Sequence, residues 1–257
     1  MIGFVLGTSE GHEILSSINE FTEDIFVSTS TQYGGDLLKN YKIKHLNCKP
    51  LNEEEFKEYI KRLNINIFVD GSHPYAKEVS KTLIKVCKEL NVKYIRYERT
   101  SYFDLIENNE NIIRIDDYSE LEEALKNIDG NVLNTTGSNN ALNINNLNLK
   151  NRVIHRVLPS PSILKKLVDN GLSLDNIIAI KGPFGKYIND GIIKEYNIKA
   201  IITKDSGLEG GVLEKVESAF ENKAKVILIS KPKVNYEIVF NNIEEMIGFI
   251  KKEFGGN

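Results

Sequence analysis

Short apolar runs alternate with longer amphipathic segments along almost the whole chain. Ile2–Leu6, Ile25–Val27 and Ile67–Val69 are three such runs, and a helical pattern follows each of them. Runs that are apolar throughout, rather than alternating with polar residues, are typical of strands buried on both faces of a parallel sheet. The alternation therefore predicts an α/β fold of repeated strand–helix units, with helices on both faces of parallel sheets.

The chain is long enough for two such sheets. It has 257 residues, whereas single domains most often contain about 100 to 150. The pattern loosens in the polar stretch Glu107–Asn111, which is typical of a loop or hinge between domains. We therefore predict two Rossmann-like domains, residues 1–106 and 107–257, whose parallel sheets face an interdomain cleft. The Asn-rich segment Ser138–Asn148 is expected to be a loop.

The charge and cysteine content exclude several classes of partner. The formal net charge is −3, from 33 basic and 36 acidic residues, so no overall field attracts nucleic acid or an anionic membrane. Cys48 and Cys87 do not have metal-ligand spacing, and we expect no metal site. The apolar run at 2–6 has no basic leader and is too short for a membrane span. We expect a cytoplasmic protein that is a monomer or a small homo-oligomer.

The turn Asp70–Ala76 is the part of the chain best suited to chemistry. It follows the apolar run Ile67–Val69 and contains His73, which places an imidazole at the carboxyl edge of the predicted sheet, where open α/β sheets bind ligands. The alternative is that His73 caps a helix beginning near Tyr75, with Pro74 at its first position. These seven residues alone do not distinguish the two interpretations.

Two further loops lie at the same predicted edge. Residues Gly7–Gly11 follow the first strand and open a helix, where backbone N–H groups and the helix dipole can hold a phosphate; such glycines also occur in simple turns. Residues Ser28–Ser30 follow the second strand, where an NAD-binding fold usually has an acidic residue for the ribose. Hydroxyls there favour NADP, although turn residues that face water are an equal alternative.

Polar loops also follow three strands of the second half. They are Asn134–Ser138, Lys181–Phe184 and Thr203–Gly207. The first and third are suited to phosphate, the lysines are suited to carboxylates, and Pro183 with Phe184 provides an apolar face. Each loop by itself is more often a plain connection, but several of them on two sheets predict a ligand site in a cleft.

Two groups of charged residues allow alternative interpretations. Arg152 and Arg156 share one face of a predicted strand, so both either bind carboxylates of an acidic ligand or lie on the solvated surface. For Arg96, Glu98 and Arg99 we favour an internal ion pair. The chain has no Ser-His-Asp order and no close carboxylate pair. The chemistry is therefore expected to come from a bound cofactor.

Six of these motifs, taken in order, resemble the precorrin-6A reductase family of cobalamin biosynthesis. The resemblance extends from the first strand to about Pro232, and the motifs are Gly-Thr-Ser-Glu-Gly at 7–11, Asp-Gly-Ser-His-Pro-Tyr-Ala at 70–76, Thr-Thr-Gly at 135–137, Arg-Val-Leu-Pro at 156–159, Lys-Gly-Pro-Phe at 181–184 and Thr-Lys-Asp-Ser-Gly at 203–207. It implies two Rossmann-like domains and the NADPH-dependent reduction of a ring double bond in the tetrapyrrole precorrin-6A, or its cobalt form, to precorrin-6B. A cobalt-containing and a metal-free macrocycle both fit.

The resemblance and the loops together assign candidate roles. His73 and Tyr75 are the candidate catalytic residues, as relays of the proton that accompanies hydride transfer. The candidate cofactor contacts are Gly7, Thr8, Ser9, Glu10, Gly11, Ser28, Thr29, Ser30, Asp70, Thr136, Gly137 and Ser138. The candidate substrate contacts are Arg156, Lys181, Gly182, Pro183, Phe184, Lys204, Ser206 and Gly207. Lys181 departs from the family, which often has Gln there.

Two other functions remain as alternatives. A nonenzymatic regulator that binds NADP(H) through the first domain would bind the cofactor without turnover. A tetrapyrrole methyltransferase using S-adenosylmethionine would not bind a nicotinamide.

Overall fold

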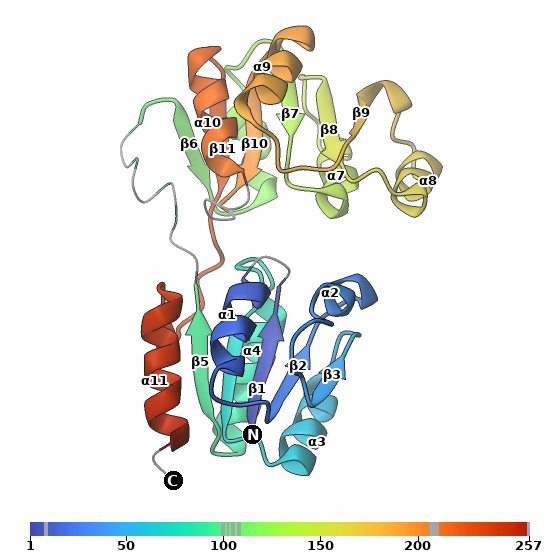
Figure 1. The fold of residues 1–257 in the computed structure, drawn as a ribbon. Helices are drawn as coiled ribbons and strands as arrows, with labels where there is room; N and C mark the ends of the chain where they lie inside the picture. The colour runs from blue at the N-terminus through green and yellow to red at the C-terminus, as the bar shows by residue number, and fades with distance from the viewer. Residues whose placement is uncertain are drawn as a thin grey trace. The chain divides into compact units, whose positions relative to one another are not determined.

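Two compact units make up the chain. The computed structural model describes residues 1–7, 10–98, 101, 103, 106, 109–205 and 211–255. Residues Met1–Arg99 and Pro232–Asn257 form the first unit, and Thr100–Lys231 form the second. Each unit contains a six-stranded sheet flanked by helices (Figure 1), and every described strand pairing is parallel. The predicted α/β class with two parallel sheets is confirmed.

The sheet of the first unit has the strand order β12-β5-β4-β1-β2-β3. Its elements are β1 (Ile2–Leu6), α1 (Gly11–Asn19), β2 (Ile25–Ser28), α2 (Gln32–Leu37), β3 (His45–Asn47), α3 (Glu53–Leu63), β4 (Ile67–Gly71), α4 (Lys77–Glu89), β5 (Lys93–Tyr97), β12 (Val239–Phe240) and α11 (Ile243–Gly255).

Successive residues of the central strands pack into two separate cores. Phe4 and Val69 point to the face covered by α1 and α11, whereas Val5 and Phe68 point to the face covered by α3 and α4 (Figure 1). Because side chains alternate between the faces of a strand, a run that is apolar throughout fills both cores. This burial explains why β1 and β4 lack the polar alternation of a half-exposed sheet.

The C-terminal segment does not belong where the sequence suggested. We expected residues 107–257 to form the second domain, but the chain returns to the first unit after Lys231. There β12 pairs with β5, and α11 buries Met246 and Ile250 in the core beside α1. The physical reason is that both apolar faces of a parallel sheet must be buried under helices. Helix α11 packs beside α1 and buries more of the same face.

The sheet of the second unit has the order β6-β11-β10-β7-β8-β9. Its elements are β6 (Ile112–Ile115), η1 (Tyr118–Glu120), α6 (Leu121–Leu125), β7 (Asn131–Asn134), α7 (Ser138–Asn145), β8 (Val153–Val157), α8 (Pro161–Asp169), η2 (Leu174–Asn176), β9 (Ile177–Ala179), α9 (Lys186–Glu195), β10 (Ile198–Lys204), α10 (Val212–Glu221) and β11 (Lys225–Ile229).

The Asn-rich segment expected to be a loop is helical over most of its length. Helix α7 extends from Ser138 to Asn145 and buries Ala141 and Ile144. These two residues are three apart and therefore lie on one helix face, which packs against β8 and α8. Burial of this face outweighs the low helix propensity of asparagine.

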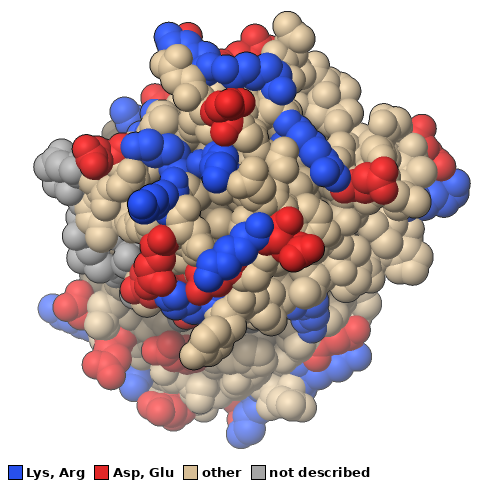
Figure 2. Space-filling model, turned by 90° about the horizontal axis from the view of Figure 1, so that it is seen from above, with Lys and Arg blue, Asp and Glu red and all other residues tan. Residues whose placement is uncertain are grey.

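Charges of both signs lie interspersed on the surface. Figure 2 shows Lys and Arg side chains next to Asp and Glu side chains across the face in view. Among the described residues, no helix combines the length and the apolar character that a membrane span requires.

The assignment of α11 to the first unit predicts where a core mutation acts. Ile250 is fully buried, so Ile250→Ala should destabilise the first unit by about 2–5 kcal/mol through lost burial and a cavity. Hydrogen exchange should then accelerate in β1 and β4 and stay unchanged in β7 and β10. Lys252→Ala, on the exposed side of the same helix, is the matched control. Faster exchange in β7 and β10 instead would contradict the assignment.

Candidate functional site

The turn after β4 presents His73 at the carboxyl edge of the first sheet. Gly71 is the last residue of β4, Ser72 is buried and His73 is exposed. The backbone N–H of Tyr75 donates to His73 Nδ1 at 3.3 Å, and the two rings lie 5.7 Å apart. Because Nδ1 accepts this bond, the proton of the neutral imidazole is on Nε2.

His73 does not cap the following helix. Helix α4 begins at Lys77, its N-cap residue is Ala76, and no side chain makes a capping hydrogen bond there. The alternative in which His73 caps a helix that has Pro74 at its first position is therefore wrong. The turn instead closes through the N–H of Ala76, which donates to the carbonyl of His73 at 2.8 Å.

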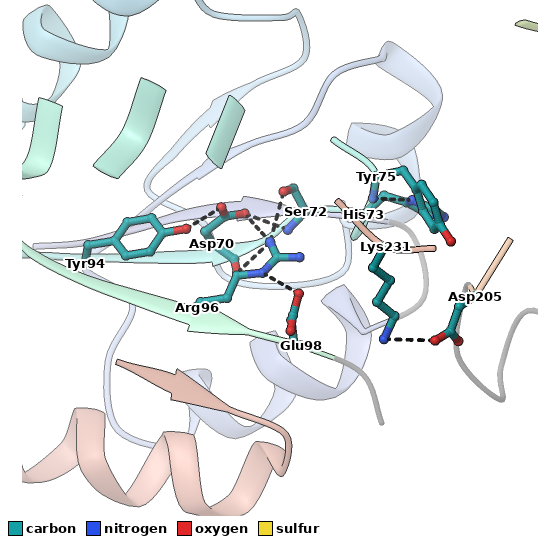
Figure 3. A network of polar contacts seen from close by, with 9 residues as sticks. All are labelled: Asp70, Ser72, His73, Tyr75, Tyr94, Arg96, Glu98, Asp205 and Lys231. Carbon is teal, nitrogen blue, oxygen red and sulfur yellow. Dashed lines mark hydrogen bonds and ion pairs between the residues drawn. The ribbon is translucent and has the colours of Figure 1, made fainter. Parts of the chain in front are cut away.

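A buried ion pair between β4 and β5 stabilises this turn. Strand pairing places Asp70 beside Arg96, and Arg96 Nη1 lies 2.9 Å from Asp70 Oδ1, with both side chains fully buried (Figure 3). Arg96 Nη1 also donates to Ser72 Oγ at 3.2 Å, and the N–H of Ser72 donates to Asp70 Oδ1 at 2.9 Å. The guanidinium thus connects β5 with Ser72, the first residue after β4.

Further groups complete this network. The Tyr94 hydroxyl donates to Asp70 Oδ2 at 2.7 Å, and burial together with the Asp70 charge raises the pKa of Tyr94 above its usual range. Glu98 Oε1 lies 3.9 Å from Arg96 Nε, and the Tyr236 ring lies 5.3 Å from the guanidinium carbon. Arg96 is therefore in an internal ion pair, as we favoured, but its close partner is Asp70. Arg99 lies outside the described residues.

The role of Asp70 differs from the expected contact with a cofactor. Both carboxylate oxygens accept hydrogen bonds from protein donors, and the side chain is not exposed. A buried carboxylate with all its partners inside the protein positions the turn rather than touching a ligand.

The loop after β1 joins the same edge. The N–H of Gly7 donates to the carbonyl of Gly71 at 3.2 Å, which connects this loop to the end of β4. Glu10 is buried and is the N-cap residue of α1, without a capping hydrogen bond from its side chain. Gly11 packs against Leu38, and a Cβ there would lie 3.1 Å from its side chain. Thr8 and Ser9 lie outside the described residues.

The hydroxyls after β2 are used differently from the expectation. Ser28 is buried and accepts a hydrogen bond from Asn47 Nδ2 at 3.0 Å. Thr29 is buried too, and its hydroxyl donates to the carbonyls of Thr31 and Asn47. These two hydroxyls join β2 to β3 and are not presented to a ligand. Ser30 is the exposed residue of the three.

In the second unit, the loop after β7 rests on a buried pair of polar side chains. Asn134 Nδ2 lies 3.0 Å from His155 Nδ1, and Asn134 Oδ1 accepts from both the N–H and the hydroxyl of Thr136. Burial lowers the pKa of His155 to about 4, so the ring is neutral. Gly137 is the N-cap residue of α7, with φ 94°, and a Cβ there would meet no atom within 4 Å. Ser138 is the first residue of α7.

Arg152 and Arg156 do not act together. Arg152 precedes the strand and donates to Asn176 Oδ1 and the Asp175 carbonyl, at the amino end of β8. Arg156 lies near the carboxyl end, where Nη1 donates to Asn189 Oδ1 at 2.9 Å and the guanidinium carbon lies 5.2 Å from the Phe184 ring. Burial lowers the pKa of Arg156 to about 10.

Other predicted substrate residues lie at or just beyond the carboxyl ends of β9 and β10. Lys181, Gly182 and Pro183 are exposed, and Lys204 is partly buried, with its pKa lowered by burial. Asp205, just after β10, lies 3.5 Å from Lys231 (Figure 3). Ser206 and Gly207 lie outside the described residues.

The sequence reading missed Lys215. This lysine lies on α10, is almost fully buried and donates to Thr203 Oγ1 at 3.0 Å. A signal was present in the sequence, because Lys215 follows Val212 by three residues and precedes Ala219 by four, which places it on the apolar face of the helix. Val212 and Ala219 are both buried.

Comparisons with known proteins agree along nearly the whole chain. The family model described as precorrin-6x reductase CbiJ/CobK matches residues 2–251. The cobalt-precorrin-6A reductase of Methanocaldococcus jannaschii is 40% identical over 95% of this chain and 95% of its own length. The reductase of the same name from Priestia megaterium is 31% identical over 96% of each chain.

One solved structure has the same fold. It is described as CobK precorrin-6A reductase, and it covers 98% of this chain and 96% of its own with a TM-score of 0.78. At 16% sequence identity this match concerns the fold alone.

Removal of one partner of the Asp70–Arg96 pair should lower the stability of the first unit considerably. Asp70→Asn leaves the buried guanidinium without its counter-charge, and we expect a loss of about 3–5 kcal/mol in local stability, measured by hydrogen exchange of β4 and β5. Glu98→Gln is the control, with an expected loss below about 1 kcal/mol because that pair is long and partly exposed. The double variant Asp70→Asn/Arg96→Met should recover part of the loss. Equal effects of Asp70→Asn and Glu98→Gln would contradict this role.

Proposed function

The chain belongs to the precorrin-6x reductase CbiJ/CobK family, and we propose that it reduces a ring double bond of cobalt-precorrin-6A with NADPH as the electron donor. The observation that carries the proposal is the family match over both units of the chain. The protein is an oxidoreductase of cobalamin biosynthesis. Membership of this family sets aside the methyltransferase and the nonenzymatic regulator.

The first sheet fits a nicotinamide cofactor at its carboxyl edge. Helix α1 follows β1 without a side-chain cap from Glu10, so N–H groups of its first turn are suited to a phosphate. Gly7, Thr8, Ser9 and Gly11 are our proposed contacts in this loop. When bound, the dihydronicotinamide would supply the hydride for the reduction.

The end of β2 supports NADPH over NADH. Residues 28–32 contain no carboxylate, the group that usually binds the ribose hydroxyls of NAD. Ser30 is exposed there and is our proposed contact for the 2′-phosphate. In the second unit, Thr136, Gly137 and Ser138 remain proposed contacts, because the space beside Gly137 admits the close approach of a ligand.

His73 is our proposed proton carrier. Reduction of a carbon–carbon double bond requires a proton on the carbon next to the one that accepts the hydride. His73 is exposed, and its turn is held by the Asp70–Arg96 network, which fixes the backbone that carries the imidazole. The Tyr75 N–H donates to Nδ1 and so fixes the orientation of the imidazole. The Tyr75 ring orients the imidazole and its hydroxyl is the second candidate.

Basic residues of the second unit are our proposed contacts for the macrocycle. Its acetate and propionate groups require cations, and Arg156, Lys181 and Lys204 lie at or just beyond the carboxyl ends of β8, β9 and β10. Gly182, Pro183 and Phe184 offer an apolar surface beside them. We propose the cobalt form as the substrate because the relatives are named for it.

Turnover in the absence of oxygen tests this function. The purified protein is mixed with NADPH or NADH and with cobalt-precorrin-6A or its metal-free form, and the nicotinamide and macrocycle spectra are followed together. We expect oxidation of NADPH that matches the change in the macrocycle, with kcat/KM at least about tenfold higher than for NADH, or about 1.4 kcal/mol. NADPH oxidation without a macrocycle change would refute the function, and equal use of NADH would refute the cofactor preference.

The proton relay is tested by two neighbouring variants. His73→Ala should lower kcat by about 100-fold, the usual scale of general acid catalysis, with the KM for NADPH unchanged. Tyr75→Phe keeps the ring contact and removes the hydroxyl, so its kcat should fall much less. If the kcat of His73→Ala equals that of the wild type, the imidazole does not carry the proton; a larger loss in Tyr75→Phe would assign the relay to the tyrosine.

A further inference from the structure

A partly buried arginine and a buried lysine lie on the same face of the second sheet. Arg156 of β8 and Thr203 of β10 point toward the side covered by α9 and α10, because Ile154 and Ile201, two residues before them, lie in the core under these helices. Arg156 bonds to Asn189 of α9, and Lys215 of α10 bonds to Thr203. The two cations therefore occupy one region near the carboxyl ends of the strands.

Neither cation forms an ion pair with an acid among the residues that the structure describes. Arg156 bonds to an amide oxygen and Lys215 to a hydroxyl, and both acceptors are neutral. By contrast, the buried Arg96 of the first unit pairs directly with Asp70. Buried charges without a counter-ion are costly, and such an arrangement is suited to an anion that comes from outside the protein.

Two of the nearby charged groups, Lys186 and Asp205, have their own ion-pair partners. Lys186 of α9 pairs with Asp190 and Glu221, and Asp205 pairs with Lys231. Glu214 is the neighbour of Lys215 on α10, and its Oε2 is buried without a hydrogen bond partner. The partly buried Lys204 adds a further positive charge.

The surroundings favour the carboxylate of an apolar ring over a phosphate. The Phe184 ring lies against the guanidinium of Arg156, and Pro183 packs against Gly211 at the start of α10, where a Cβ would lie 3.1 Å from the proline Cβ. An arginine beside an aromatic wall binds a carboxylate while the wall contacts the apolar body that carries it.

We propose that Arg156 and Lys215 form a subsite for one carboxylate of the macrocycle, in which Arg156 contacts the carboxylate and Lys215 is a positioning residue behind it. This inference rests on the proposed function and names the part of the site that selects the substrate. Lys215 donates a hydrogen bond to the hydroxyl of Thr203 and so fixes that side chain. Its positive charge also attracts the carboxylate bound to Arg156.

The protonation of Lys215 is linked to this subsite. Burial and, to a smaller extent, the charge of Arg156 lower the pKa of Lys215 to about 7, and the charge of Glu214 opposes them. Lys215 therefore gives up its proton more easily than a solvated lysine does. A carboxylate on Arg156 cancels part of the repulsion and raises the pKa of Lys215, so binding takes up a proton. Because the protonated form binds more tightly, the affinity should fall as the pH rises above 7.

Kinetics of the wild type and of three variants test the subsite. In the wild type, the KM for cobalt-precorrin-6A should rise about tenfold between pH 6 and pH 8.5, equivalent to one pKa unit of linkage, while the KM for NADPH stays constant. Lys215→Met should raise the macrocycle KM at pH 6 and abolish its pH dependence. Thr203→Val keeps the lysine and should retain the pH dependence. Lys194→Met, on the exposed surface of α9, is the control and should match the wild type.

A lysine titration gives a readout that does not depend on turnover. In protein with ¹³C-labelled lysines, one NMR signal should titrate near pH 7, be absent from Lys215→Met and move to higher pH when the macrocycle is added. A signal that the macrocycle does not move would overturn the subsite, as would a pH profile of Lys215→Met equal to that of the wild type. An absence of any turnover in the wild type would instead refute the proposed function. If Lys215→Met does not fold, the wild-type titration and pH profile decide.

Discussion

A parallel sheet has to be covered on both faces, and the architecture of this protein follows from that constraint. The central strands are apolar on both sides, so each sheet exposes its core unless helices lie against both faces. In the first unit, α11 fulfils this requirement from the far end of the chain, packing beside α1. The same arrangement leaves the carboxyl ends of the strands to be closed by loops, and the candidate residues are collected there.

The cations near the carboxyl ends of the strands have different partners in the two sheets. In the first, Asp70 neutralises Arg96, and the pair holds Ser72 and the turn that carries His73. In the second, Arg156 and Lys215 have neutral partners within the described residues. In the first arrangement the charge of Arg96 is paired inside the protein with Asp70 through Nη1, although Nε and Nη2 of the guanidinium lack hydrogen-bond partners among the described residues. In the subsite that we propose, the second arrangement gains its counter-charge when a carboxylate of the substrate binds.

The parts of the site that sequence patterns found are those encoded within a single loop. The turn at 70–76 combines a strand end, a histidine and a proline in consecutive residues, and the structure places His73 at the exposed edge. The patterns failed where burial depends on a distant element. Ser28 is buried against Asn47 of the neighbouring strand, and the patterns did not show whether its hydroxyl faces water or β3. Lys215 was missed because a lysine inside a helix is usually solvated, although its spacing from Val212 and Ala219 placed it on the buried face.

The sequence by itself determined the fold class, most of the alternation of strands and helices along the chain, the candidate loops and the family resemblance, because each of these depends on neighbouring residues. The tertiary structure decided the partner of Arg96, the unit to which α11 belongs, the burial of Ser28 and the pairing of Lys215 with Thr203. These features join residues that are far apart in the chain. Their energies come from desolvation and charge pairing, which exist only after the sheets and helices have packed.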